Sequence, residues 1–220
     1  MSTIQSDFDR IALLSTEVSN SNNHYHNFLL RHVPINCSES LEIGCGTGAF
    51  SRLLAARSKR VLAIDLSPNM IDVAKARSQE FGNIEFRVAD VMKTDLPADH
   101  FDNIVSIATL HHLAIEEVLP KIKRALKAGG TLMILDLFKA KGLADLTSSA
   151  LAMPVSLGLR LVRSGRLREP REVRKAWAEH GRTDSYLTMS QVRQICRDML
   201  PGAEVRKHLL WRYSVIWRKR

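Results

Sequence analysis

The stretch Ser40–Leu54, SLEIGCGTGAFSRLL, decides how the rest of the chain is interpreted. It begins as an apolar run typical of a buried strand, passes through three glycines spaced two apart, and continues with helical spacing. Glycine tolerates positive φ and lets the main chain approach a ligand without a Cβ in the way. The first turn of the following helix adds unpaired backbone N–H groups. The stretch therefore predicts a strand-turn-helix unit that binds a nucleotide-like ligand.

Apolar runs and helical patterns alternate around this turn. The predicted strands are Ser40–Gly44, Arg60–Asp65, Ile84–Asp90, Phe101–Leu110 and Gly130–Leu137. The predicted helices between them are Ala49–Arg57, Asn69–Phe81 and Ile115–Leu126. Ser67 suits the N-cap of the second helix, and the glycines of Lys127–Thr131 would end the third. Strands that alternate with helices indicate crossover connections and a parallel sheet.

The flanking segments differ from this core. Two helices are expected before it, at about Asp7–Glu17 and His24–His32, with Asn23 capping the second. Residues 138–188 have no convincing strand pattern, and we expect helices that lie over the sheet edge as a lid.

The last part of the chain changes pattern again. Ser190–Leu200 predicts a helix, and Ala203–Arg220 alternates polar residues with β-branched and aromatic ones. This alternation predicts an antiparallel pair of strands with a turn within Leu209–Arg212. We expect a single domain over residues 1–220: a helical cap (1–35), a cofactor-binding core (36–137), a helical lid (138–188), and a C-terminal helix and hairpin (189–220).

Composition excludes several classes of protein. The chain is 45% hydrophobic and 25% charged, and its polar N-terminus has no secretory signal pattern. No apolar stretch reaches the roughly 18 unbroken residues of a membrane span. The three cysteines, Cys37, Cys45 and Cys196, form no CxxC pair and no ligand-spaced set with histidine. We therefore expect a reduced, cytoplasmic protein without a metal site.

The net charge of +9 is unevenly placed. Residues 1–138 carry 14 Lys and Arg against 16 Asp and Glu, whereas residues 139–220 carry 18 against 7. One interpretation is a solvated basic surface, since charge concerns solubility and encounter more than fold. The others are an acidic partner, an anionic small molecule, or peripheral contact of the basic tail with a membrane surface.

Two ligand classes fit the glycine turn. Gly44, Gly46 and Ala49 satisfy a loose dinucleotide fingerprint, so a nicotinamide enzyme is an alternative. Asp65, at the end of the next strand, would bind a ribose in either case. Glu42 sits poorly with a pyrophosphate but suits a ligand that carries a sulfonium and an ammonium. Asp90 can accept a hydrogen bond from an adenine amino group, and there is no room for a separate substrate domain.

Five motifs taken together resemble one family. LEIGCGTG (41–48), AIDLSPNM (63–70), VAD (88–90), FDNIVSIATLHHL (101–113) and ALKAGGTLMILD (125–136) resemble the class I S-adenosylmethionine-dependent methyltransferases in order and spacing. The resemblance covers about residues 36–137 and is closest to the small-molecule group with ubiquinone/menaquinone-type enzymes. It implies an α/β, Rossmann-like sheet of seven mostly parallel strands with an antiparallel last strand, helices on both faces, and the lid between strands five and six.

The same resemblance implies how the cofactor S-adenosylmethionine, and its product S-adenosylhomocysteine, would be held. The turn Gly44–Gly48 would pass under the methionine part, and Glu42 would orient that turn or reach the amino group through water. Asp65 would take both ribose hydroxyls. Leu66 and Met70 would flank the adenine, Asp90 and Val91 would bind its edge, and Ile107 and Ala108 would line the methionine side. The full set of cofactor-binding candidates is Glu42, Gly44, Cys45, Gly46, Gly48, Asp65, Leu66, Met70, Asp90, Val91, Ile107 and Ala108.

Catalytic candidates come from two places. His111 and His112 follow the fourth predicted strand, at the carboxyl edge where such sheets bind ligands, and Asp136 ends the fifth. Tyr25 and His26 belong to the N-terminal segment that folds over the cofactor in similar enzymes. Histidine titrates in the range that a proton acceptor needs, so His112 or His26 would face the site and Tyr25 would close it.

The sequence predicts the methyl acceptor less closely than it predicts the cofactor. The apolar part of the lid (146–159) and its basic part (160–174) suggest a small acceptor that is amphipathic or acidic, unless the arginines merely solvate the lid. Methyl transfer could reach an O, N or C nucleophile. Alternatives are a protein- or nucleic-acid-directed enzyme and a silent cofactor-binding protein. The chain lacks the tetrapeptide of amino-methylating DNA enzymes and the aromatic pattern of RNA-binding modules, which argues against nucleic acid.

Overall fold

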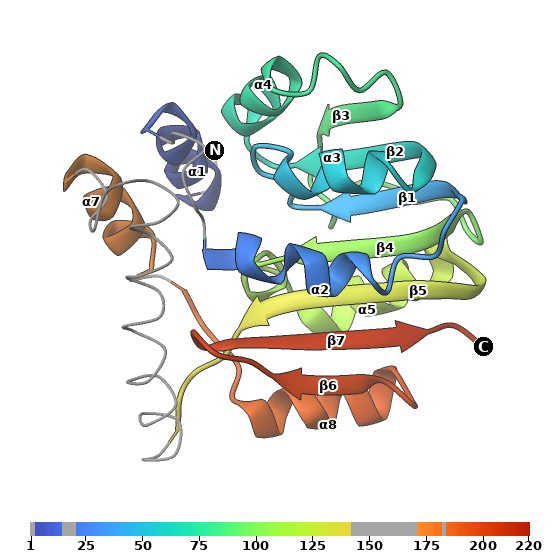
Figure 1. The fold of residues 1–220 in the computed structure, drawn as a ribbon. Coiled ribbons are helices and arrows are strands. Elements are labelled where there is room, and N and C mark those ends of the chain that lie inside the picture. Colours follow the sequence, from blue (N-terminus) through green and yellow to red (C-terminus); the bar gives the residue numbers. More distant parts are fainter. Residues whose placement is uncertain (1–2, 15–20, 142–170, 182–183) are drawn as a thin grey trace.

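The computed structural model describes residues 3–14, 21–141, 171–181 and 184–220. A seven-stranded sheet has the order β3-β2-β1-β4-β5-β7-β6 (Figure 1). The strands are β1 (Cys37–Ile43), β2 (Ser58–Asp65), β3 (Ile84–Val88), β4 (Phe101–Ile107), β5 (Leu126–Leu137), β6 (Glu204–Lys207) and β7 (Arg212–Arg218). The first five pair in parallel, and β7 is antiparallel to both of its neighbours. The predicted parallel sheet with an antiparallel last strand is confirmed.

Helices cover both faces of this sheet. One face carries α5 (Ile115–Ala125) and α8 (Met189–Met199), and the other carries α2 (His26–Leu30), α3 (Ala49–Ala55) and α4 (Pro68–Ala76). Alternation along the strands divides the core between the faces, so that Ile104 packs with the α5 and α8 side and Val105 packs with α2 and α3. Ser67 accepts a hydrogen bond from Met70 N at 3.1 Å, which confirms the predicted cap of α4.

Two helices lie beside the carboxyl edge of the sheet. Figure 1 shows the arrowheads of β1, β4 and β5 pointing to the side on which α1 (Thr3–Leu14) and α7 (Arg171–His180) lie. These two helices pack on one another, and α1 also packs on α4. Arg10 pairs with Glu179 at 2.6 Å, and Ser67 donates a hydrogen bond to Asp9. Distant parts of the sequence therefore close over the edge where the glycine turn lies.

Two local predictions are wrong. The N-cap of α2 is Tyr25, not Asn23, and no side chain caps it, because a 3₁₀ turn (Ser21–Tyr25) runs directly into the helix. The glycines of Lys127–Thr131 do not end α5, which stops at Ala125 where β5 begins. Instead, Gly129 bends the start of β5 at a φ of 74° and donates to Lys219 O at 2.8 Å.

The predicted lid is described only in part. α7 lies where one of its helices was expected, but residues 142–170 and 182–183 lie outside the described residues, as do residues 15–17 of the first predicted helix. The hairpin turn falls between β6 and β7 as predicted, with positive φ at Leu210 and Trp211. Among the described helices, none combines the length and the apolar character that crossing a membrane requires.

Replacing Gly48 should destabilise the fold. Gly48 has a φ of 74°, and an added Cβ would lie 2.9 Å from the Phe86 ring and 3.2 Å from Ala74. We expect Gly48→Ala to lower the free energy of unfolding by about 2–4 kcal/mol, from left-handed strain and overpacking together. Urea denaturation measures it. Gly82→Ala is the matched control, because open space surrounds Gly82; an equal loss in both variants would contradict the packing argument.

Candidate functional site

The glycine turn leaves one open position. Gly44, Gly46 and Gly48 all have positive φ, at 73°, 51° and 74°. A Cβ at Gly44 would overlap Thr109, and one at Gly48 would meet Phe86, so packing within the protein accounts for both. A Cβ at Gly46 would meet nothing within 4 Å. The bare main chain at Gly46 therefore faces space that a ligand can occupy.

Asp65 fixes this turn from the end of β2. Its Oδ2 accepts a hydrogen bond from Gly46 N at 2.8 Å, and its Oδ1 accepts one from Ser67 N at 2.9 Å. Burial raises the pKa of Asp65, and the backbone hydrogen bonds oppose that shift. Each carboxylate oxygen retains a second lone pair, so the group can still accept from a ligand hydroxyl.

Glu42 lies under the turn, near the end of β1. Its side chain is 2% exposed and accepts a hydrogen bond from Ser51 Oγ of α3. Burial raises its pKa to about 8, with a further contribution from the charge of Asp65. Glu42 is therefore mostly protonated at neutral pH when no ligand cation is near.

The other predicted cofactor-binding residues divide into two groups. Cys45, Met70 and Val91 are buried, and Met70 packs against Ile11 and Ala176 of α1 and α7. The half-buried group, which retains surface at the carboxyl edge, is Leu66, Asp90, Ile107 and Ala108. Of the twelve predicted residues, the described contacts link Gly46 directly to Asp65, and the electrostatics couple Glu42 to that pair.

Asp90 is held by its own turn. Its Oδ1 accepts a hydrogen bond from Met92 N at 2.9 Å, and its Oδ2 lies 3.7 Å from Lys93 Nζ. Ala89 N donates to Asp65 O at 2.8 Å, so the strand ends that carry the two acids are neighbours. These contacts leave a lone pair on each carboxylate oxygen of Asp90.

A second group of polar side chains lies at the ends of β4 and β5. We call it the histidine–aspartate cluster, and it consists of His111, His112, Asp136, His180 and Asp184. The 3₁₀ turn η2 (Leu110–His112) supplies the first two, β5 supplies Asp136, and α7 ends at His180. Elements far apart in the sequence thus bring three imidazoles and two carboxylates together.

Asp136 holds His111 in place. Asp136 Oδ1 lies 2.6 Å from His111 Nδ1, and its Oδ2 accepts from His111 N at 3.0 Å. Because Oδ1 also accepts from Leu137 N, the carboxylate acts as acceptor and Nδ1 carries the hydrogen. The Nε2 atom of His111 is then the basic one, and it lies on the side of Asp184, 4.0 Å from Oδ2.

Asp184 is the centre of the cluster. It is 4% exposed, and its Oδ2 accepts a hydrogen bond from Tyr186 at 2.6 Å. Its Oδ1 lies 3.5 Å from His112 Nδ1 and 3.8 Å from His180 Nε2. The sequence prediction missed Asp184, His180 and Tyr186, because nothing in their local pattern indicates that α7 returns them to the sheet edge.

His112 is a buried imidazole with one unpartnered nitrogen. Its side chain is 7% exposed, and its Nε2 atom has no hydrogen-bond partner within the described part of the chain. Burial and the neighbouring His111 lower its pKa to about 4, so it is neutral at pH 7. Phe8 meets the ring edge-on, with 5.6 Å between the ring centroids.

Tyr25 and His26 lie elsewhere. The Tyr25 hydroxyl donates to Leu209 O at 2.7 Å, and burial raises its pKa. His26 packs on Phe50 of α3, and burial lowers its pKa to about 4. No described contact joins either residue to the histidine–aspartate cluster. Arg212 connects the two regions electrostatically, because both Tyr25 and Asp136 raise its pKa against the effect of burial.

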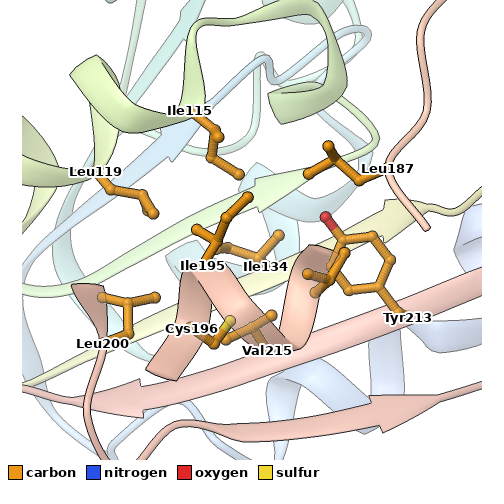
Figure 2. Close-up of a pocket in the computed structure, with 10 residues that line it drawn as sticks. Ile115, Leu119, Ile134, Leu187, Ile195, Cys196, Leu200, Tyr213 and Val215 are labelled. Carbon is orange, nitrogen blue, oxygen red and sulfur yellow. The ribbon is translucent and has the colours of Figure 1, made fainter. Parts of the chain in front are cut away.

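An apolar pocket lies between α5, α8 and the strands β5 and β7, and its lining residue Tyr213 is paired with Asp136 in the sheet (Figure 2). Figure 2 shows Ile115 and Leu119 facing Ile195 and Leu200 across it, with the Tyr213 hydroxyl toward Leu187. Its lining contains no residue of the glycine turn and no cluster residue. We therefore assign it to the packing between α5 and α8 and not to the site.

Comparison with known proteins agrees with this geometry. A methyltransferase-domain family model matches residues 41–134. An uncharacterized methyltransferase of Mycobacterium tuberculosis is 31% identical over 208 residues, covering 90% of this chain and 96% of that protein. The malonyl-(acyl-carrier protein) O-methyltransferase of a Paenibacillus species is 42% identical over 100 residues, covering 42% of this chain and 36% of that protein.

The fold has a matching solved structure. The N-methyltransferase NodS from Bradyrhizobium japonicum, in complex with S-adenosyl-L-homocysteine, has a TM-score of 0.65 at 19% identity, covering 99% of both chains. At that identity the match concerns the fold, whereas the mycobacterial relative matches in sequence along nearly the whole length. With its glycine turn, its seven-stranded sheet and this full-length relative, the chain belongs to the class I S-adenosylmethionine-dependent methyltransferase family.

Proposed function

We propose that this methyltransferase acts on a small acidic or amphipathic molecule, at an O, N or C nucleophile that needs no proton removed at the site. The observation that carries the proposal is the open main chain at Gly46, tied to Asp65 at the same sheet edge as Arg212. Once bound, S-adenosylmethionine supplies a methyl group on a positively charged sulfur. Transfer then depends on alignment and on exclusion of water.

The residues at the turn fit this cofactor. The bare face of Gly46 admits the methionine part, and the remaining lone pairs of Asp65 suit ribose hydroxyls. Asp90 keeps an oxygen for the adenine amino group. The half-buried Leu66, Ile107 and Ala108 offer the walls, while the buried Cys45, Met70 and Val91 support them from behind.

Burial argues against a free catalytic base among the predicted candidates. His112 and His26 each have a pKa of about 4, and the Tyr25 hydroxyl donates to a carbonyl. His111 is held by Asp136 and is 6% exposed. We therefore give these four residues the role of shaping the acceptor site. An acceptor that arrives as a carboxylate, a phenolate or a neutral amine would react without a base.

Arg212 is the proposed anchor for an acidic acceptor. It begins β7, opposite Leu137, and so lies at the end of β5 beside Asp136. Its Nε donates to Asn22 at 2.9 Å, and it is only half-buried. Its Nη1 also donates to Leu210 O, at 2.5 Å, and the remaining N–H groups of Nη1 and Nη2 can donate to a carboxylate. The malonyl group named for the Paenibacillus relative carries such a carboxylate, which supports an acidic acceptor.

We also propose three broader features of this protein. They are the division of one domain into cap, core, lid and hairpin, a cytoplasmic location, and a small molecule rather than a protein or nucleic acid as acceptor. The absence of a membrane-crossing helix among the described residues is compatible with them. An acceptor screen with small acids and with RNA tests the third directly.

Gly46→Ala tests the cofactor position. The new Cβ would meet no protein atom, so the loss of stability should be confined to the left-handed strain, about 1–2 kcal/mol. The methyl would occupy the space given to the cofactor, so we expect affinity for S-adenosylmethionine to fall at least about 10-fold. Calorimetric titration measures it, with NAD as a negative control ligand and Gly82→Ala as the control variant. Unchanged affinity would show that the cofactor does not bind at this turn.

Glu42 should release a proton when the cofactor binds. Its pKa of about 8 means that it is mostly protonated at pH 7, and a cationic ligand beside it favours the ionised form. We expect about one proton to leave per cofactor bound at pH 7, and affinity to weaken as pH falls below 8. Calorimetry in two buffers of different ionisation enthalpy counts the proton. Glu42→Gln should remove both effects; if it does not, the proton comes from another group.

Arg212→Gln should weaken binding of the acceptor and leave binding of the cofactor unchanged. Loss of a charge-assisted pair to a carboxylate should raise KM for an acidic acceptor at least about 10-fold, with cofactor affinity unchanged. Radiolabelled methyl transfer to a panel of small carboxylic acids, each paired with its amide, provides the measurement. Arg218→Gln is the control, because that arginine is exposed at the far end of the same strand. Equal turnover of acids and amides would contradict the acidic acceptor.

A further inference from the structure

The histidine–aspartate cluster gathers buried carboxylates and imidazoles in one place. Asp136 and Asp184 are 1% and 4% exposed, and Asp7 pairs with the cluster through His180 Nδ1 at 3.3 Å. Buried carboxylates are costly unless they are paired or bind a cation. The cluster therefore holds the carboxylates and imidazoles that a cation site needs.

The separations around Asp184 are longer than good hydrogen bonds and slightly longer than the distances between ligands of one metal ion. Its two oxygens lie 3.5 Å from His112 Nδ1, 3.8 Å from His180 Nε2 and 4.0 Å from His111 Nε2. All three distances exceed a good N–H···O bond. Two ligands at about 2.0–2.1 Å from one tetrahedral ion stand roughly 3.3–3.5 Å apart. A small inward movement would bring these nitrogens and the carboxylate onto one ion.

The outer contacts orient two of the histidines as metal sites require. Asp136 accepts from His111 Nδ1, which turns Nε2 toward Asp184. Asp7 does the same for His180, whose Nε2 also lies on the Asp184 side. Histidines that bind a metal ordinarily donate their other ring N–H to a carboxylate or a carbonyl. Two such pairs converging on one buried carboxylate are hard to explain by packing alone.

His112 adds an independent observation. This imidazole is more than nine-tenths buried, and its Nε2 atom has no hydrogen-bond partner among the described residues, while its Nδ1 lies 3.5 Å from Asp184 Oδ1. A buried polar group without a partner costs about 1–3 kcal/mol in a folded protein. Neutral imidazole nitrogen is a preferred ligand of divalent transition metals.

We infer that His111, His112 and Asp184 form a binding site for one divalent transition-metal ion of the zinc type, with His180 beside it as a fourth donor. Two or three imidazoles and one carboxylate suit zinc better than magnesium or calcium, which prefer oxygen ligands. The ion would join α7 and the segment after it to the ends of β4 and β5. The inference does not depend on methyl transfer or on the identity of the acceptor.

Cobalt is the probe, because tetrahedral Co²⁺ in a zinc site absorbs visible light. The full chain, freed of metal by a chelator, should bind one Co²⁺ with tetrahedral bands, and one equivalent of Zn²⁺ should displace it. Zn²⁺ at saturation should also raise Tm by about 5–10 °C. Asp136→Asn removes the carboxylate that orients His111 but is not itself a proposed ligand, and it should weaken Co²⁺ binding about 10–100-fold.

Two further variants complete the experiment. Asp184→Asn keeps the shape of the side chain and should abolish the tetrahedral bands. His100→Gln is the control, since His100 is an exposed histidine beside Glu39 and should leave binding unchanged. Calorimetric titration of Asp184→Asn with S-adenosylmethionine should give the wild-type affinity, which separates this site from the cofactor turn and shows that the variant is folded.

The opposite results are equally clear. Wild-type protein that binds no Co²⁺, or binds it without tetrahedral bands, would overturn the inference. So would binding that Asp184→Asn leaves intact or that His100→Gln removes, because the ion would then lie on surface histidines. Should Asp184→Asn fail to fold, the wild-type spectrum and the response of Asp136→Asn still decide the matter.

Discussion

Neighbouring parallel strands end at the same edge of a sheet, and every group of the site depends on that constraint. β1 leads into the glycine turn, β2 ends at Asp65, β4 leads to His111, and β5 ends beside Asp136. Their order in the sheet, and not their order in the sequence, sets which groups meet. Asp65 thus lies beside the glycine turn and Asp136 beside His111, while α1 packs on both α4 and α7.

The structure of the glycine turn and of Asp65, where we propose that the cofactor binds, could be predicted because its signals are local. The spacing of Gly44, Gly46 and Gly48 indicates positive φ within a single turn, and Ser67 caps the very next helix. Asp65 follows from the length of one strand-helix-strand unit. Local signals failed where one pattern fits two structures. The glycines at 129 and 130 could end a helix or bend a strand, and in the structure they bend β5, which pairs with β7.

The region where we propose that the acceptor binds could not be predicted in the same way. Asp184 and Arg212 come close to Asp136 through tertiary packing, by way of α7 and the returning β7, and no spacing rule encodes that proximity. Burial also changes what a residue type means. A histidine in the sequence suggests a general base. In the structure, burial lowers the pKa of both His26 and His112 to about 4, so neither ring retains an abstracted proton at neutral pH. Met70, expected beside adenine, is part of the contact between three helices.

The place of β7 has a consequence for how the molecule is assembled. β7 enters the sheet between β5 and β6, so the last strand along the chain pairs on both sides, with partners up to 87 residues earlier, as in the Thr131–Arg218 pair. Contacts of such long sequence separation form late and slowly, because a large loop must close before they contribute. The first five strands can pair while the chain is still emerging from the ribosome, but Arg212 arrives only with the final insertion. If the proposed sites are right, the growing chain would be able to bind the cofactor before it could bind an acceptor.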